Sequence, residues 1–101
     1  MNSFPVTQTV AQTILQQLKA TSSRKMLCWG SRQFIGMGNG LKFKVSGLKF
    51  TGYVYVIYET GSDTYKVQLG VIRKGAWVVK KEVNDVYWDN LGDVIDGLVE
   101  R

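Results

Sequence analysis

The chain has 101 residues, of which 45% are hydrophobic and 21% charged, and its 13 Lys and Arg against 8 Asp and Glu give a formal net charge of +5. This length and apolar fraction predict one folded domain over residues 1–101 and exclude a disordered chain. With no histidine and one cysteine, the chain lacks the commonest general base, an internal disulfide and a cysteine-built zinc site.

Membrane insertion and export have no signal in the sequence. No stretch approaches the ~18 uninterrupted apolar residues that a membrane helix requires. The first basic residue is Lys19, so the N-terminus lacks the basic region of a secretory signal. Because Cys28 stands alone and no export signal precedes it, we expect a cytoplasmic protein with no membrane partner.

The charge is divided unevenly along the chain. Residues 1–81 contain 12 Lys and Arg against two acids, a net of +10, whereas residues 82–101 contain one Arg against six acids, a net of −5. A basic body indicates an anionic partner or an internal match with the acidic end. Solubility alone explains the same pattern equally well.

The first predicted element is an amphipathic helix over residues 7–19. Its apolar residues recur at helical spacing, at Val10, Ile14, Leu15 and Leu18. Pro5 and Thr7 suit the first turn and the N-cap, and residues 20–23 end the helix.

Alternating apolar residues separated by glycine-containing turns then predict short antiparallel strands. The expected strands cover residues 25–29 and 33–37 (or one bent strand over 25–37), 41–45, 53–58, 64–73 and 76–83, with turns at 36–40, 60–63 and 74–75. Within 41–45, Leu41, Phe43 and Val45 share one side. Cys28 lies in an apolar run, which predicts a small buried side chain.

A second amphipathic helix is predicted over residues 85–99, with Asn84 or Asp85 as its N-cap. Gly92 and Gly97 each cost up to about 1 kcal/mol relative to Ala, so this helix should depend on packing against the sheet. The predicted fold class is therefore α+β: an N-terminal helix, an antiparallel meander of about four to five strands and a C-terminal helix, with both helices on one sheet face.

Five blocks of the sequence, in this order, resemble a group of small proteins carried by bacteriophages and mobile elements of gut-type bacteria. The blocks are residues 9–18, 41–45, 53–56, 63–67 and 85–91. The chain differs from this group at residues 20–23, where the relatives carry a glycine pair. The resemblance implies a phage or mobile-element setting and a compact single domain. It implies no activity and no functional residues, because no function is established for the group.

Catalytic chemistry has few candidate residues. Acid–base catalysis without histidine requires a tuned carboxylate pair, and the basic body offers only Glu59 and Asp63, of which Asp63 suits a turn. Aspartates 85, 89, 93 and 96 share a helical side but lack a second ligand cluster, which favours a solvent-facing role over a metal site.

Cys28 has no histidine to generate a thiolate. The glycine-rich residues 36–40 lack the Lys that follows in a phosphate loop. We expect no enzyme, cofactor or metal.

A binding role is the remaining prediction. If the apolar strand side faces the helices, the opposite side presents a candidate binding face of Lys42, Lys44, Tyr53, Tyr55, Ile57, Lys66, Gln68 and Lys80. Mixed aromatic, aliphatic and cationic residues of this kind are typical of protein interfaces, so we expect a host or phage protein, or a second copy of the chain forming a homodimer. The alternative is single-stranded nucleic acid, with Lys on phosphates and Tyr stacked on bases.

Overall fold

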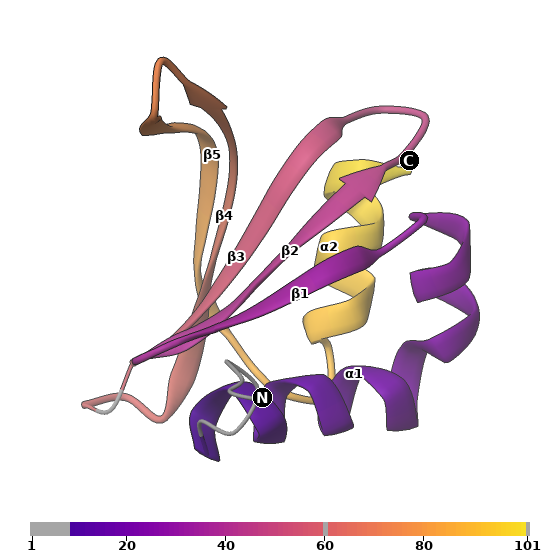
Figure 1. Ribbon diagram of the computed structural model, residues 1–101. Coiled ribbons are helices and arrows are strands. Elements are labelled where there is room, and N and C mark those ends of the chain that lie inside the picture. The colour runs from indigo at the N-terminus through magenta and orange to yellow at the C-terminus, as the bar shows by residue number, and fades with distance from the viewer. Residues whose placement is uncertain (1–8, 60, 101) are drawn as a thin grey trace, which may run out of the picture.

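One antiparallel sheet with two helices on the same side of it makes up the fold (Figure 1). The computed structural model describes residues 9–59 and 61–100, so the expectations at Pro5 and Thr7 lie outside the described residues. The elements in chain order are α1 (Thr9–Cys28), β1 (Arg32–Met37), β2 (Gly40–Ser46), β3 (Thr51–Glu59), β4 (Thr64–Arg73), β5 (Ala76–Val86) and α2 (Leu91–Val99). The predicted α+β class, with an N-terminal helix, an antiparallel meander and a C-terminal helix, is confirmed.

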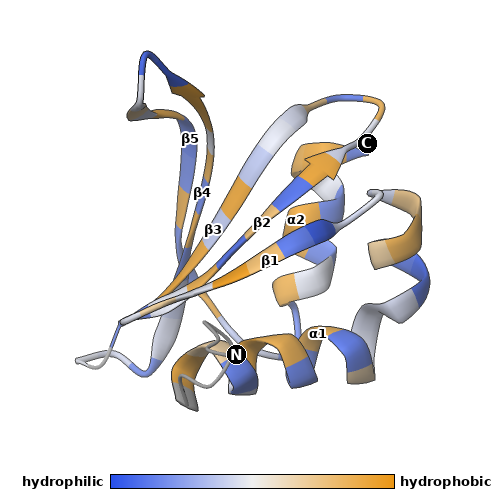
Figure 2. Ribbon diagram, viewed as in Figure 1, coloured by the Kyte–Doolittle hydropathy of each residue, from blue (hydrophilic) through white to orange (hydrophobic). Residues whose placement is uncertain are grey.

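The strands follow one another in space as they do in sequence, in the order β1-β2-β3-β4-β5, and each pair is antiparallel. Hydrophilic and hydrophobic residues alternate along them, as Figure 2 shows. The strand side chains that face the helices are buried at Leu41, Phe43, Val45, Val54, Val56, Tyr65, Val67 and Leu69. This two-residue period is what alternation predicts for a sheet covered on one face.

The helices complete the core from that one side. Ala11, Ile14 and Leu18 of α1, and Leu91, Ile95 and Val99 of α2, are fully buried in the same cluster as the sheet residues. None of the described helices combines the length and the apolar character that crossing a bilayer requires.

Helix α1 extends further than predicted. Ser22 has non-helical backbone angles (φ −145°, ψ 30°) where the sequence predicted an end, but a second helical segment continues to Cys28. The strand predicted over residues 25–29 is therefore wrong. Met26 and Trp29, three residues apart, are buried, whereas Leu27 is 82% exposed. This spacing of three places one helical face on the core.

The burial predicted for Cys28 is also wrong, because its side chain is exposed. In an alternating strand, Cys28 would lie on the same side as Met26. In the helix, it lies on the solvent side of the second segment, between the exposed Leu27 and the fully buried Trp29.

Helix α2 begins later than predicted, at Leu91, because β5 continues through Val86. Asn84 and Asp85 are strand residues, and Asp85 has a φ of +56° at an irregularity of the β4–β5 register. Position 90 is the N-cap, although the Asn90 side chain accepts a hydrogen bond from the backbone N–H of Tyr87 and makes none to the helix. The four aspartates thus share no helical side, since positions 85 and 89 precede α2.

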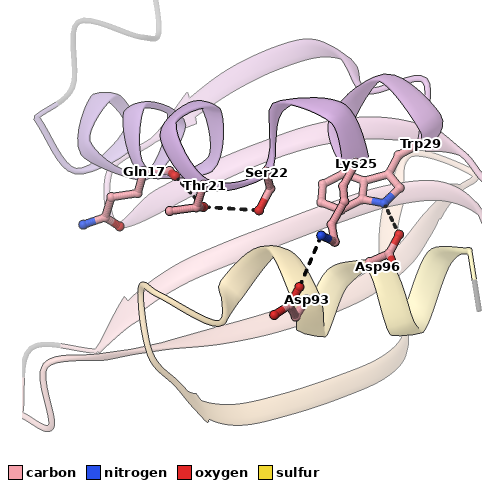
Figure 3. Close-up of polar contacts among 7 residues, drawn as sticks. All are labelled: Gln17, Thr21, Ser22, Lys25, Trp29, Asp93 and Asp96. Atoms are coloured by element: carbon pink, nitrogen blue, oxygen red, sulfur yellow. Dashed lines mark hydrogen bonds and ion pairs between the residues drawn. The ribbon is translucent and has the colours of Figure 1, made fainter.

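Polar contacts connect the two helices (Figure 3). The buried Trp29 donates its indole N–H to Asp96 at 3.0 Å, and Lys25 forms an ion pair with Asp93 at 3.5 Å. At its other end, α2 presents the carbonyl of Val99 to two backbone N–H groups of the β2–β3 turn. Asp93 and Asp96 of α2 are therefore engaged on the helix side of the molecule.

Candidate binding face of the sheet

The face of the sheet opposite the helices, called here the outer face, brings most of the predicted residues together. Directly paired residues of neighbouring strands point to the same side of a sheet. The register aligns Lys42, Tyr55, Gln68 and Glu82 in one row across β2 to β5, aligns Lys44, Tyr53, Gly70 and Val79 in the next, and pairs Ile57 with Lys66. Seven of the eight predicted residues share this face: Lys42, Lys44, Tyr53, Tyr55, Ile57, Lys66 and Gln68.

Lys80 is the exception. Leu69 pairs with Lys81 and Gly70 with Val79, so Lys80 falls at the irregularity between these two pairs. An extra residue of this kind is a bulge, which interrupts the alternation of the strand. Lys80 is exposed but belongs to neither row. A prediction that alternates sides along the strand from residue 76 cannot reveal the extra residue of a bulge.

Trp77 lies at the centre of the outer face and was missing from the sequence prediction. Its ring lies edge-on to Tyr53 and Tyr55, at centroid distances of 6.5 and 6.3 Å, and we call these three residues the aromatic cluster. The ring covers Gly70, where a Cβ atom would come within 2.7 Å of it. The two-residue turn at 74–75 was the available signal, because such a hairpin pairs Ile72 with Trp77 and so places both on one face.

Two lysines extend over the aromatic rings. The Nζ atom of Lys42 lies 4.3 Å from the ring centroid of Trp77 and 5.4 Å from that of Tyr55, and the Nζ atom of Lys44 lies 6.0 Å from that of Tyr53. A cation–π contact at a partly exposed site contributes about 0.5–1 kcal/mol. The ammonium groups of both lysines therefore lie over the rings of the aromatic cluster.

Hydrogen bonds orient the polar groups around the cluster. Gln68 accepts from the Trp77 indole N–H at 3.2 Å and donates to Glu82 at 2.9 Å. The Tyr55 hydroxyl donates to the Asn39 side chain at 2.7 Å. Burial raises the pKa of Tyr55 above its usual range, while this hydrogen bond opposes the shift. Tyr55 is therefore a neutral hydroxyl at physiological pH.

Aliphatic side chains border the aromatic cluster. The register places Ile35 beside Lys42, Ile72 beside Trp77, and Val79 beside Gly70. These three side chains are between 40% and 51% exposed. The outer face is thus a mixed surface of aromatic, aliphatic and cationic groups.

The two acids considered for catalysis lie at the end of β3 and in the turn that follows it. Glu59 pairs with Thr64 and lies two residues beyond Ile57, on the same side of the strand. Asp63 occupies a turn with a φ of +56°, its backbone N–H bonds the carbonyl of Glu59, and its carboxylate accepts a 2.5 Å hydrogen bond from Tyr58. Within residues 9–59 and 61–100, no three His, Cys, Asp or Glu residues are grouped so that they could hold a metal ion. The outer face therefore carries groups suited to binding, and the turn between β3 and β4 is held by the hydrogen bond between Tyr58 and Asp63.

No protein-family model matches the chain, and no curated protein or solved structure is significantly similar to it.

Proposed function

We propose that the protein is a non-catalytic binding module whose outer face docks onto a partner protein that exposes carboxylate side chains. The observation that carries this proposal is the aromatic cluster, in which Trp77 is seated over Gly70 between two tyrosines and beneath Lys42. No described helix covers this cluster, because both helices pack on the other side of the sheet.

Pre-organisation supports protein docking. Trp and Tyr are enriched among the residues that contribute most to binding, particularly at the centre of an interface. Here the hydrogen bond to Gln68 and the edge-on ring contacts already orient Trp77. Binding therefore loses little side-chain entropy, a loss that otherwise costs about 0.5–1.5 kcal/mol for each immobilised side chain. The half-exposed Ile35, Ile72 and Val79 supply the apolar border that excludes water.

Charge supports an acidic partner. Lys42, Lys44 and Lys66 lie on the outer face, where Glu82 is the acid of the same rows. The acids of α2 lie on the helix side, where Trp29 and Lys25 engage Asp96 and Asp93. Complementary potentials of this kind accelerate association and select partners more than they add affinity.

Single-stranded nucleic acid is the second candidate, and the separation of charge favours it too. Helix α2, with its acids, packs on the opposite side of the sheet, so the sheet separates these acids from a polyanion bound at the outer face. Bases bind by stacking on aromatic ring faces. The face of the Trp77 ring is already covered by the Lys42 ammonium at 4.3 Å, which favours protein docking over stacking.

The resemblance to phage and mobile-element proteins makes a host or phage protein the expected partner. A second copy of the chain is the homodimeric version of the same proposal, and light scattering across concentration detects it. With one exposed thiol at Cys28 and no second cysteine, we propose the cytoplasm as the compartment.

Photo-crosslinking in cells that carry the gene tests the docking face. A benzophenone amino acid replaces Ile57 on the outer face or, as the matched control, the exposed Gln12 of α1. We expect one crosslinked protein from position 57, none from position 12, and loss of the crosslink on Trp77→Ala or Lys42→Glu. Equal crosslinking from both positions, or a crosslink that survives Trp77→Ala, contradicts the proposal.

A parallel titration with a labelled oligonucleotide at low and high salt distinguishes the second candidate. Binding at low salt that weakens steeply with salt, and that is lost when Lys42, Lys44 and Lys66 are reversed in charge, supports nucleic acid. If the oligonucleotide does not bind even at low salt, nucleic acid is excluded as the partner.

A further inference from the structure

A second potential site lies on the helix side of the sheet, at the end where the β3–β4 turn meets α1. A cavity of about 240 Å³ opens there, lined by Val10, Thr13, Gln17, Tyr58, Asp63 and Tyr65. Sites for drug-sized ligands span roughly 300–1,000 Å³, so this cavity is of the size for a small head group. It is separate from the outer face, because Tyr65 is buried on the helix side.

The cavity carries an acidic side chain, although the part of the chain that forms it is rich in basic residues. Residues 1–81 carry 12 basic residues and two acids, and one of those two acids, Asp63, lines the cavity. Among residues 9–59 and 61–100, no Lys or Arg lines it. The Asp63 side chain is exposed to solvent. Its carboxylate repels an anionic ligand and attracts a cation, with the modest strength of an ion pair in contact with solvent.

The two phenol oxygens that line the cavity are set as acceptors. The Tyr58 hydroxyl donates its proton to Asp63 at 2.5 Å, and the Tyr65 hydroxyl donates to the side-chain oxygen of Gln17 at 2.7 Å. Each hydroxyl carries one proton, so both phenol oxygens retain only acceptor capacity. The hydrogen bond to Asp63 raises the pKa of Tyr58, which keeps its hydroxyl neutral and donating at physiological pH.

Two aromatic rings complete the wall. Tyr58 and Tyr65 are cross-strand partners whose ring centroids lie 5.9 Å apart at an angle of 61°. The Tyr65 ring is only 6% exposed and supports the partly exposed Tyr58 ring. A cation in the cavity therefore meets the Tyr58 ring, and cation–π attraction acts within about 6 Å of a ring centroid. Their hydrogen bonds to Asp63 and Gln17 hold both rings in place before a ligand arrives.

We propose that the cavity between α1 and the β3–β4 turn binds the alkylammonium head group of a small molecule, with Asp63 as the countercharge and Tyr58 and Tyr65 as the aromatic wall. This site is independent of the outer face, so its failure or success leaves the proposed docking function untouched. The chemistry requires a positive charge with an apolar shell, as in a quaternary amine, and excludes neutral molecules of the same shape.

The probe is choline, and its matched control is the neutral isostere dimethylbutanol, in which carbon replaces the quaternary nitrogen. Each is titrated into isotope-labelled full-length protein and followed by amide chemical shifts. We expect choline to bind with a dissociation constant in about the millimolar range, with shifts concentrated at Gln17, Tyr58, Asp63 and Tyr65. Dimethylbutanol should bind roughly 10-fold more weakly or not at all.

Asp63→Asn is the test variant, because Asn adopts the positive φ of this turn and keeps an acceptor oxygen. It should weaken choline binding about 10-fold, whereas the control Glu59→Gln, at the other acid of residues 1–81, should change it less than about twofold. Equal binding of choline and dimethylbutanol, no shifts at these residues, or unchanged binding by a folded Asp63→Asn variant overturns the proposal. If that variant does not fold, the comparison of the two ligands on the unmodified protein still decides.

Discussion

Replacement of Gly92 by alanine tests how closely the two helices approach one another. Gly92 is buried in the first turn of α2, and Ser22 is buried at the kink of α1. A Cβ atom on residue 92 would lie 1.8 Å from the Oγ atom and 2.6 Å from the Cβ atom of Ser22. Helix propensity alone predicts that alanine stabilises α2 by about 1 kcal/mol. The contact with Ser22 instead predicts that alanine at position 92 destabilises the protein.

The magnitude follows from which atoms collide. Rotation of the Ser22 hydroxyl relieves the 1.8 Å contact, but the 2.6 Å contact with its Cβ atom remains, because that atom is fixed by the backbone. The helices must therefore separate, and overpacking of this kind costs about 1–3 kcal/mol. A 2.6 Å contact with an atom that cannot rotate away places the cost in the upper part of this range, at about 2–3 kcal/mol. After the propensity gain of about 1 kcal/mol is subtracted, we expect a net loss of about 1–2 kcal/mol in the free energy of unfolding. For a domain of this size, each kcal/mol lowers Tm by about 4–8 °C.

Urea unfolding of four proteins measures the effect: the parent, Gly92→Ala, Ser22→Gly and the double variant. Ser22→Gly removes both colliding atoms, so alanine at position 92 should be neutral or stabilising in that background, with a coupling energy above about 1 kcal/mol. Gly38→Ala is the control, since a Cβ there meets nothing within 4 Å. A Gly92→Ala variant as stable as the parent, or no rescue by Ser22→Gly, refutes this account of the helix contact.

Three further predictions concern other contacts. Gly40→Ala should destabilise the fold by about 3 kcal/mol or more in urea unfolding, because its Cβ would lie 1.9 Å from a backbone carbonyl oxygen of β3 that the sheet holds in place. Asp96→Ala should cost about 1–3 kcal/mol, because the buried Trp29 indole N–H loses its acceptor. Stability should also fall at alkaline pH: the hydrogen bond to Asp63 raises the pKa of Tyr58, so its contribution is complete below about pH 10 and is lost as the pH rises through the folded-state pKa.

Each of these predictions has a matched comparison. Gly61→Ala, which meets nothing within 4 Å, should unfold like the parent. Asp93→Ala removes the exposed ion pair with Lys25 and should cost at most about 1 kcal/mol; a loss equal to that of Asp96→Ala contradicts the role given to the indole. Tyr58→Phe should flatten the alkaline fall in urea-unfolding stability, and an unchanged pH profile in that variant rules out the Tyr58–Asp63 bond as its cause.

The sequence alone determined that residues 33–37, 41–45, 53–58, 64–73 and 76–83 lie in strands, and which side of the central strands is buried. Leu41, Phe43 and Val45 alternate with Lys42 and Lys44, and a period of two has one interpretation in a sheet covered on one face. The predicted turns at 36–40 and 74–75 contain the two hairpin turns of the structure, at 38–39 and 74–75. Positive φ values occur in the second of these, at Lys74 and Gly75. These local features also placed seven of the eight candidate residues on the outer face.

Tertiary structure alone decided the rest. The run over residues 25–29 is too short for its period to separate a helix from a strand, and packing of Met26 and Trp29 into the core selects the helix. Pairing of Val83 and Val86 with β4 extends β5 into the segment predicted as helix. Trp77 joins the tyrosines because Gly70, on the neighbouring strand, leaves room for its ring. Local propensity encodes an element, whereas its limits and neighbours depend on contacts between residues far apart in the chain.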